Sequence, residues 1–273
     1  MSEPKVKARK QSGLKKFLHK VTGPWRALKG VWERFLSILP AWLSPWVRDI
    51  VDVAVTVLVI IVVLKFIFRA DMLVPLVVVT SDSMVHEYGD GSWKTWMTNK
   101  GITDPTIAEF PMQNGFNMGD MILVKDPNTA LGDVIIYERD LDHLTFQSKD
   151  PIIHRVVGIV HVENYQPVRS EGTLDCYRLA DFNQYVVKVI ECQRSKSYCP
   201  YTRYPLTGNF KFYLTKGDHN DGSDQCSTKL GISHPVTETQ ITGRALLRLP
   251  YLGWPKMLLS LIFQILSLPF QLL

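Results

Sequence analysis

The sequence lacks several patterns that would assign it to a familiar class of protein. Its four cysteines form no Cys-x-x-Cys pair, which argues against a zinc site. It has no internal repeat and no low-complexity tract, which argues against a repeat architecture. Between residues 72 and 250 it has no long stretch of helical periodicity, which argues against an all-helical domain. We also expect no metal and no cofactor.

Apolar residues make up 46% of the 273 residues, but they are unevenly placed and concentrate at 51–79 and 257–273. The first of these runs, Val51–Phe68, would give roughly 27 Å of helix, close to the thickness of a bilayer core. Its one charge, Lys65, lies near its far end, where a long side chain can reach the interface. No small-x-small cleavage site follows the run, so we expect a transmembrane helix at 50–70 and not a cleaved leader.

Positive charge is concentrated before this helix. Residues 1–49 carry eleven Lys or Arg against three acidic residues, although the net charge of the chain is only +5. Such an excess places the amino terminus in the cytoplasm and residues 71–250 outside. Aromatic residues interleave with the basic ones, namely Trp25, Trp32, Phe35, Trp42 and Trp46. We therefore interpret 1–49 as a cytoplasmic basic amphipathic segment facing membrane lipid or simply flanking the span, and we expect no nucleic acid partner.

The outer region predicts a mainly β domain with antiparallel strands. Short apolar runs are separated by turn signals, and two of them follow the Gly-Asp pairs Gly119-Asp120 and Gly132-Asp133. Strands are expected at 72–80, 121–125, 134–137, 152–162, 184–190, 210–215 and 241–249. The Gly-, Asp- and Asn-rich stretch at 87–117 is expected to be a surface excursion outside the core.

The carboxyl-terminal segment, 251–273, is a second hydrophobic region. Residues 257–273 are uncharged, and Pro269 lies near their end. They can form a helix that spans the membrane or one that lies in the interface. No basic residue follows to anchor a cytoplasmic end, which favours the interfacial helix.

Five short blocks, in this order, resemble the type I signal peptidases, and specifically their archaeal and endoplasmic-reticulum branch. The blocks are Ser81-Asp-Ser-Met84, Gly119-Asp-Met-Ile122, Gly132-Asp-Val-Ile-Ile-Tyr137, His154-Arg-Val-Val-Gly158 and Lys216-Gly-Asp-His-Asn220. Two later pieces, Gly243-Arg-Ala245 and Leu249-Pro-Tyr-Leu-Gly253, resemble the closing motif of that branch. The resemblance runs from about 70 to 255 and leaves out 1–49 and insertions at about 87–117 and 163–209. Bacterial members have Lys where His154 stands.

The resemblance implies a serine endopeptidase that removes signal peptides from exported preproteins at the outer face of the cell membrane. Its expected partners are preprotein substrates, membrane lipid and the secretion translocon. Two alternatives stay open. One is a membrane-tethered, catalytically silent β-fold binding module, and the other is a self-cleaving peptidase of the related repressor type, which uses a Ser-Lys pair.

The resemblance also implies roles for single residues. The serine directly before Met, Ser83, would be the nucleophile, and His154 would be the base that takes its proton. Ser81 would supply a hydroxyl to the developing oxyanion beside the backbone N–H of Ser83. We expect both serines on one strand. The other histidines compete with His154 for the role of base, and they are His19, His86, His143, His161, His219 and His234. His86 is the strongest rival because it lies three residues from Ser83; many relatives have Pro there.

A carboxylate should orient the imidazole, and two qualify, Asp218 and Asp224. In the family the later of two such aspartates usually orients the imidazole, so we favour Asp224 for this role and keep Asp218 as a supporting residue. The cysteines, Cys176, Cys192, Cys199 and Cys226, all follow the predicted span, which favours disulfides with three possible pairings. A bridge at Cys226 would hold the loop that carries Asp224.

Overall fold

The computed structural model describes residues 44–69, 74–86, 92–143, 150–195, 199–226 and 232–267. Most of the basic segment predicted at 1–49 lies outside these residues. The chain divides into two compact units, 1–62 and 63–273, and each is described by itself.

The first unit contributes most of α2 (Ser44–Phe68), a long apolar helix. Its segment Asp49–Phe68 is long and apolar enough to cross a membrane, and none of that window is buried by other parts of the described chain. Lys65 lies in the last turn of the helix, as the sequence predicted.

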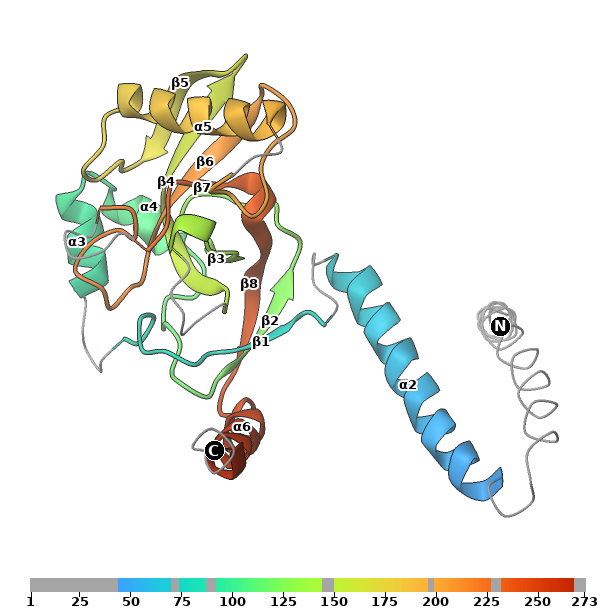
Figure 1. Cartoon of the computed structure of the whole chain (residues 1–273). Helices are drawn as coiled ribbons and strands as arrows, with labels where there is room; N and C mark the ends of the chain where they lie inside the picture. Colours follow the sequence, from blue (N-terminus) through green and yellow to red (C-terminus); the bar gives the residue numbers. More distant parts are fainter. Residues whose placement is uncertain are drawn as a thin grey trace, which may run out of the picture. The chain divides into compact units, whose positions relative to one another are not determined.

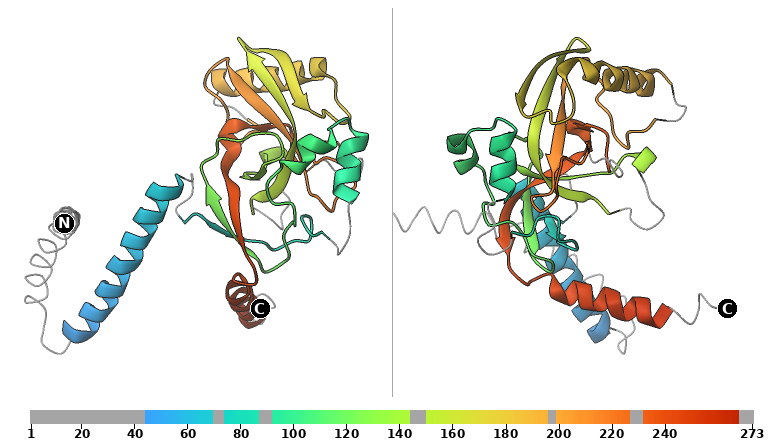
Figure 2. Two further views of the ribbon diagram at one scale, coloured as in Figure 1. Left: turned by 180° about the vertical axis from the view of Figure 1, so that it is seen from behind. Right: turned by 90° about the vertical axis from the view of Figure 1, so that its left-hand side faces the viewer.

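The second unit is built on one antiparallel β-sheet that curls into a half-barrel (Figures 1 and 2). The strand order is β1-β2-β8-β3-β4-β6-β7, with β5 paired to β4. The strands are β1 (Leu76–Val78), β2 (Met121–Lys125), β3 (Val134–Tyr137), β4 (Ile152–Glu163), β5 (Gln166–Gly172), β6 (Phe210–Lys216), β7 (Val236–Thr237) and β8 (Ile241–Leu249). The predicted mainly antiparallel β domain is confirmed, although β1 is shorter than expected and β5 and β7 were not predicted.

The two Gly-Asp pairs form turns that are attached to the same strand. Gly119 and Gly132 have φ near +85°, a left-handed conformation that glycine adopts without strain. The aspartate after each glycine accepts a hydrogen bond from the backbone of its own turn, at Asn117 N and Ala130 N.

Each of these aspartates also forms an ion pair with an arginine of β8. Asp120 pairs with Arg248 at 2.6 Å and Asp133 pairs with Arg244 at 3.0 Å. The turns before β2 and β3 are therefore held to the strand that lies between β2 and β3 (Figure 1).

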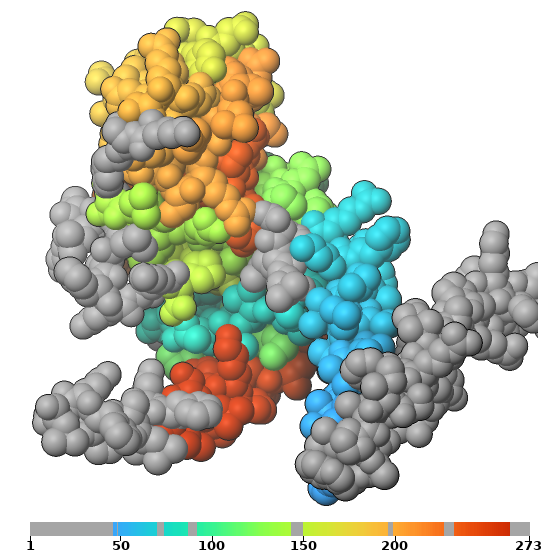
Figure 3. Space-filling view, turned by 45° about the vertical axis from the view of Figure 1, so that its right-hand side comes forward, coloured from blue at the N-terminus to red at the C-terminus, as the bar shows by residue number. Residues whose placement is uncertain are grey.

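The strand predicted at 184–190 is wrong, because these residues belong to the helix α5 (Asn183–Arg194). Tyr185, Val186, Val189 and Cys192 are buried along α5. The spacing of these four residues is that of a helix face, whereas the β-branched residues within the segment suggested a strand. In the space-filling view, α5 and its neighbours in the chain form the surface at one end of the domain (Figure 3).

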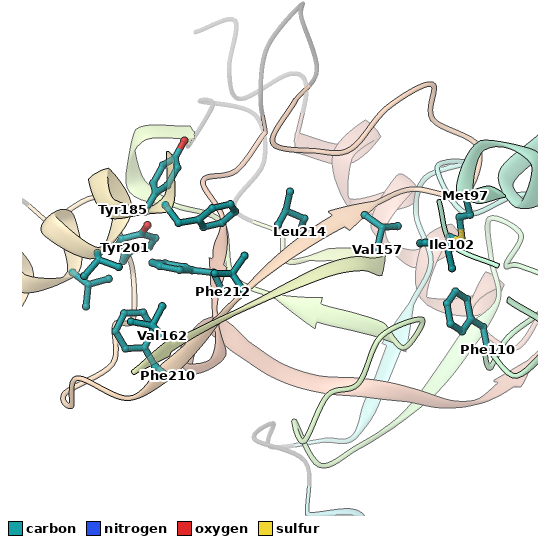
Figure 4. Packing of buried hydrophobic residues seen from close by; sticks show 14 of the residues in the cluster. Met97, Ile102, Phe110, Val157, Val162, Tyr185, Tyr201, Phe210, Phe212 and Leu214 are labelled. Carbon is teal, nitrogen blue, oxygen red and sulfur yellow. The ribbon is translucent and has the colours of Figure 1, made fainter. Parts of the chain in front are cut away.

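The prediction that 87–117 lies outside the core is also wrong. The stretch contains two helices, α3 (Ser92–Asn99) and α4 (Asp104–Ala108). Their apolar side chains share one cluster with β4, β6 and α5. Figure 4 shows Met97, Ile102 and Phe110 at one end of this cluster and Tyr185, Tyr201 and Phe212 at the other, with Val157 and Leu214 between them.

The carboxyl-terminal helix α6 (Trp254–Ser267) follows β8 directly (Figures 1 and 2). Its start is fixed to the sheet, because Gly253 N donates to Gly119 O and Tyr251 N donates to Asp120 Oδ1. Large apolar side chains around it are exposed, namely Tyr251, Leu252, Trp254, Leu258, Leu259, Leu261 and Ile262. A hydrophobic helix is thus present where the sequence predicted one, and whether it spans a membrane stays a prediction.

Truncating Met97 tests whether the 92–116 stretch belongs to the core. The side chain of Met97 is 1% exposed, so we expect Met97→Ala to lower the free energy of unfolding by about 2–5 kcal/mol. Asn99→Ala in the same helix is the matched control, because Asn99 is exposed, and it should change stability by less than about 0.5 kcal/mol. Thermal or urea unfolding followed by circular dichroism measures both changes in stability. Equal effects of the two substitutions would show that the 92–116 stretch does not belong to the core.

Candidate active site

Ser83 lies in a turn that follows β1, and not on a strand as the sequence suggested. The turn is held by its neighbour Met84, which is 1% exposed and packs with Val79, Phe116 and Ile122. Met84 O accepts a hydrogen bond from Phe116 N at 2.8 Å. The serine side chain is half-buried. A buried methionine thus fixes the position of a partly accessible hydroxyl beside it.

The structure brings Ser83, His154 and Asp224 together from three separate parts of the chain. Ser83 Oγ lies 2.9 Å from His154 Nε2, and His154 Nδ1 lies 2.6 Å from Asp224 Oδ2. His154 stands on β4, opposite Ile135 of β3, and Asp224 lies in the loop after β6. Both side chains are almost fully buried. With Asp224 ionised, Nδ1 carries the ring proton and Nε2 is free to accept the proton of Ser83.

Two further hydroxyls bind the same oxygen of Asp224. Thr215 Oγ1 donates to Asp224 Oδ2 at 2.6 Å, and Tyr137 Oη donates to it at 3.0 Å. Burial raises the pKa of Tyr137 well above 10, and the negative charge of Asp224 raises it further. Tyr137 therefore remains a neutral donor. Three donors converge on one carboxylate oxygen, which holds the carboxylate rigidly against His154.

Asp218 does not contact His154 in the described hydrogen-bond network and instead pairs with Arg155. The guanidinium donates from Nε and Nη2 to the carboxylate at 2.7–3.2 Å. Its remaining donors reach the carbonyls of Pro111, Met112 and Gly132. Arg155 is fully buried, so the pair satisfies a charge that would otherwise be very costly. Burial by itself raises the pKa of Asp218, but Arg155 and His86 outweigh it and lower the pKa to about 2.

The Asp218 loop lies directly against the Ser83 turn. His219 N donates to Ser83 O at 2.9 Å, and Asp218 N contacts Met84 Sδ at 3.4 Å. A Cβ placed on Gly217 would lie 2.7 Å from Ser83 O, so only glycine permits this approach. Asp218 therefore supports the position of the Ser83 turn, and Asp224, which we favoured, is the carboxylate that contacts the imidazole.

Helix α3 covers this charged loop with two tryptophans. The guanidinium of Arg155 lies 4.6 Å from the ring centre of Trp93, and Lys216 Nζ lies 5.0 Å from that of Trp96. Lys216 is itself buried, which lowers its pKa below 10.5, and it donates to the carbonyls of Gly217 and Asp218. Contacts between cations and aromatic rings are strongest where water is excluded. The stretch that we predicted to be a surface excursion thus supports the site.

The other predicted residues take different places. Ser81 Oγ lies 3.2 Å from Ser83 Oγ, close enough to contribute to the same reaction site, but through a turn and not along a strand. His86 bonds to Asp218 and not to Ser83. His161 pairs with Glu171 and His234 with Asp142, so neither contacts the serine. The side chain of His143 and the whole of His19 lie outside the described residues.

Sequence reasoning missed Arg155, Tyr137, Thr215 and Lys216 as parts of the site. Arg155 offered a signal, because it is a charge inside the apolar strand Ile152–Glu163 and a buried charge needs a partner. Tyr137 and Thr215 offered none, since each sits in an ordinary apolar strand pattern.

Two disulfides are formed, Cys176–Cys226 and Cys192–Cys199. The first confirms the hypothesis that a bridge at Cys226 holds the Asp224 loop. The same loop is also held by Asp175, which accepts from Ser223 Oγ at 2.7 Å and pairs with Lys100 at 2.6 Å. Among the residues described, no group of three or more His, Cys, Asp and Glu could hold a metal.

Comparison with known protein families finds no family that matches the sequence, and no curated protein matches it.

The two carboxylates should fail in different ways when they are neutralised. Asp218→Asn leaves Arg155 buried without a charge partner, so we expect the free energy of unfolding to fall by about 3–5 kcal/mol. Asp224→Asn leaves Arg155 paired but disturbs the tautomer of His154, so the peptidase activity that the sequence predicts should fall by about 10⁴-fold. Urea unfolding and initial rates measure the two effects. The opposite pattern, with stability lost at Asp224 and turnover alone lost at Asp218, would exchange their roles.

The two disulfides should differ in their effect on stability. The Cys176–Cys226 bridge closes a separation of 50 residues and Cys192–Cys199 one of 7. Chain entropy then predicts a loss of about 4 kcal/mol for the Cys176→Ser, Cys226→Ser double variant and about 2 kcal/mol for Cys192→Ser, Cys199→Ser. Only the first pair should also impair turnover, because it alone adjoins Asp224. Unfolding and rate measurements on both pairs check this, and impaired turnover in the second pair would contradict it.

Proposed function

We propose that the chain is a membrane-anchored serine endopeptidase of the signal peptidase I type, which removes signal peptides from exported preproteins at the outer face of the membrane. The observation that carries the proposal is the unbroken chain of contacts from Ser83 through His154 to Asp224. A hydroxyl, an imidazole and a carboxylate in this order are the parts that acyl transfer by a serine requires.

The proposed reaction uses these three side chains in turn. Ser83 Oγ attacks the scissile carbonyl carbon while its proton passes to His154 Nε2. Asp224 stabilises the resulting imidazolium through Nδ1. The protonated ring then gives its proton to the leaving amine, and the amine departs with the bond electrons. Water attacks the acyl-enzyme with His154 again as base, which releases the carboxylate product and restores Ser83.

The oxyanion that forms on attack needs donors close to Ser83. Ser81 Oγ lies 3.2 Å from Ser83 Oγ and is exposed, so it can turn toward a substrate oxygen. The backbone N–H of Ser83 is the second donor in this proposal. Removal of one such donor costs about 10²–10³-fold in rate.

The substrate is proposed to bind as an added strand. β1 stands at one end of the described sheet and pairs with β2 on one side only. Its chain continues within five residues to Ser83. A segment in extended form beside β1 would receive main-chain hydrogen bonds and pass close to the nucleophile.

The anchor is proposed to restrict enzyme and substrate to the same surface. Ser83 follows the end of α2 by about 15 residues, so the chain can place the serine no more than about 50 Å from that end. A signal peptide is itself an apolar membrane segment, and confinement of both partners to one bilayer raises their effective concentration. The basic residues before α2 support an orientation with the amino terminus in the cytoplasm.

The alternative of a silent binding module requires that the triad has no catalytic purpose. The buried Asp224 argues against it, because taking a carboxylate out of water costs free energy that an apolar side chain would not cost, and here the carboxylate is aligned with His154 and Ser83. The repressor-type alternative would need a lysine near Ser83. Lys216 is buried, but its Nζ binds the carbonyls of Gly217 and Asp218, and the base at Ser83 is His154.

Cleavage of a preprotein tests the proposal. We expect the full chain in detergent or liposomes to cut a signal-peptide-bearing substrate at one site. Ser83→Ala and His154→Gln should each lower kcat by at least about 10⁴-fold while the protein stays folded. His161→Gln is the matched control, because His161 lies on the same strand but pairs with Glu171. Wild-type protein that binds preprotein without cutting it would favour the binding module.

A further inference from the structure

We propose that His86 is a positively charged positioning residue, whose two ring N–H groups tie the Ser83 turn to Asp218. The inference rests on the proposed function only for its effect on turnover; the charge of His86 follows from its contacts alone. The site would then work only while His154 is neutral and His86 is protonated.

Both ring nitrogens of His86 face acceptors. Nδ1 lies 3.1 Å from the backbone carbonyl of Gln113, and Nε2 lies 2.8 Å from Asp218 Oδ2. A backbone carbonyl has no proton to give, so Nδ1 must carry one. Asp218 is ionised, because the buried guanidinium of Arg155 donates to it from both Nε and Nη2, so Nε2 must carry one as well. A neutral ring would point a lone pair at one of these oxygens.

Among the described residues, charged and aromatic groups near His86 act on this charge in both directions. Asp218, in the loop after β6, favours the cation. Arg155 on β4 binds the same carboxylate and is a cation that opposes it, and Lys94 on α3 is a second cation, 5.3 Å from the centre of the Trp93 ring. Trp93 on α3 stacks on the ring, with centres 5.2 Å apart and planes 21° from parallel. An indole face attracts cations, so this contact also favours the protonated form.

The position of the ring explains what it does for the site. His86 lies three residues after Ser83, and its side chain reaches across to the loop whose His219 N binds Ser83 O. Gly115 approaches the ring so closely that a Cβ there would lie 2.7 Å from it. The histidine thus joins the serine turn, the Asp218 loop and the 110–116 segment. The hydrogen bonds and the ring contact described for His86 reach no member of the triad, which is why it is a positioning residue.

Loss of the His86 proton at rising pH would break one of its two hydrogen bonds and loosen the serine turn. Misplacement of a nucleophile by about 1 Å costs up to about 10²-fold in rate. Activity should therefore rise with pH as His154 loses its proton and fall at higher pH as His86 loses its own. The fall is the part that this inference adds.

The kinetic experiment compares pH profiles of wild type and His86→Gln with a signal-peptide substrate. Gln can donate one hydrogen bond to Asp218 but does not titrate. We expect a roughly tenfold to hundredfold lower kcat, an unchanged KM, and no fall at high pH. His161→Gln should keep the wild-type profile. A fall at high pH that persists in His86→Gln would overturn the inference.

A second measurement does not depend on turnover. Nitrogen NMR of the imidazoles in the full-length wild type, with His86→Gln to assign the signal, reports the protonation of each ring nitrogen. At pH 7 we expect both nitrogens of His86 to be protonated, and one unprotonated nitrogen would overturn the inference. If wild type cuts no preprotein, the proposed function fails while the NMR result still decides the charge of His86.

Discussion

The buried ion pair between Arg155 and Asp218 is the constraint on which the rest of the site depends. A fully buried guanidinium cannot be left without a partner, and here it uses its donors on one carboxylate and three carbonyls. These bonds fix β4, the loop after β6 and the 110–116 segment in one arrangement. β4 also carries His154, and the loop leads to Asp224. The Arg155–Asp218 pair therefore sets the distance between the His154 imidazole and the Asp224 carboxylate, although it contacts neither side chain.

Two aspartates six positions apart thus have separate tasks. Asp218 neutralises buried positive charge, whereas Asp224 receives three donors on one oxygen and orients the imidazole. Both tasks need an ionised carboxylate, but the partners differ, since one is a permanent cation and the other is an imidazole. In the proposed reaction the imidazole gains and loses a proton, and the separation of the two tasks leaves the Arg155–Asp218 framework unchanged while it does so.

The sequence predicted the strands and the triad more reliably than their supports. Short apolar runs between turn signals predicted β2, β3, β4, β6 and β8 closely, because a strand buried in a sheet has a strong local pattern. Val186 and Val189 misled in α5, where β-branched residues pack as a helix face. The 92–116 stretch misled because its glycines and polar residues conceal the spacing of Trp93 and Met97. Tyr137 and Thr215 act through tertiary contacts, which no local pattern reveals.

The bridge between Cys176 and Cys226 also bears on how the protein is made. The bridge joins residues far apart in the sequence and adjoins Gln225, which binds the backbone of Thr215 at 3.0 Å. Thiols stay reduced in most cytosols, so a chain synthesised there begins without this link. Preparations from reducing and oxidising hosts are then chemically different molecules with the same amino-acid sequence. Thiol titration before any assay separates the two.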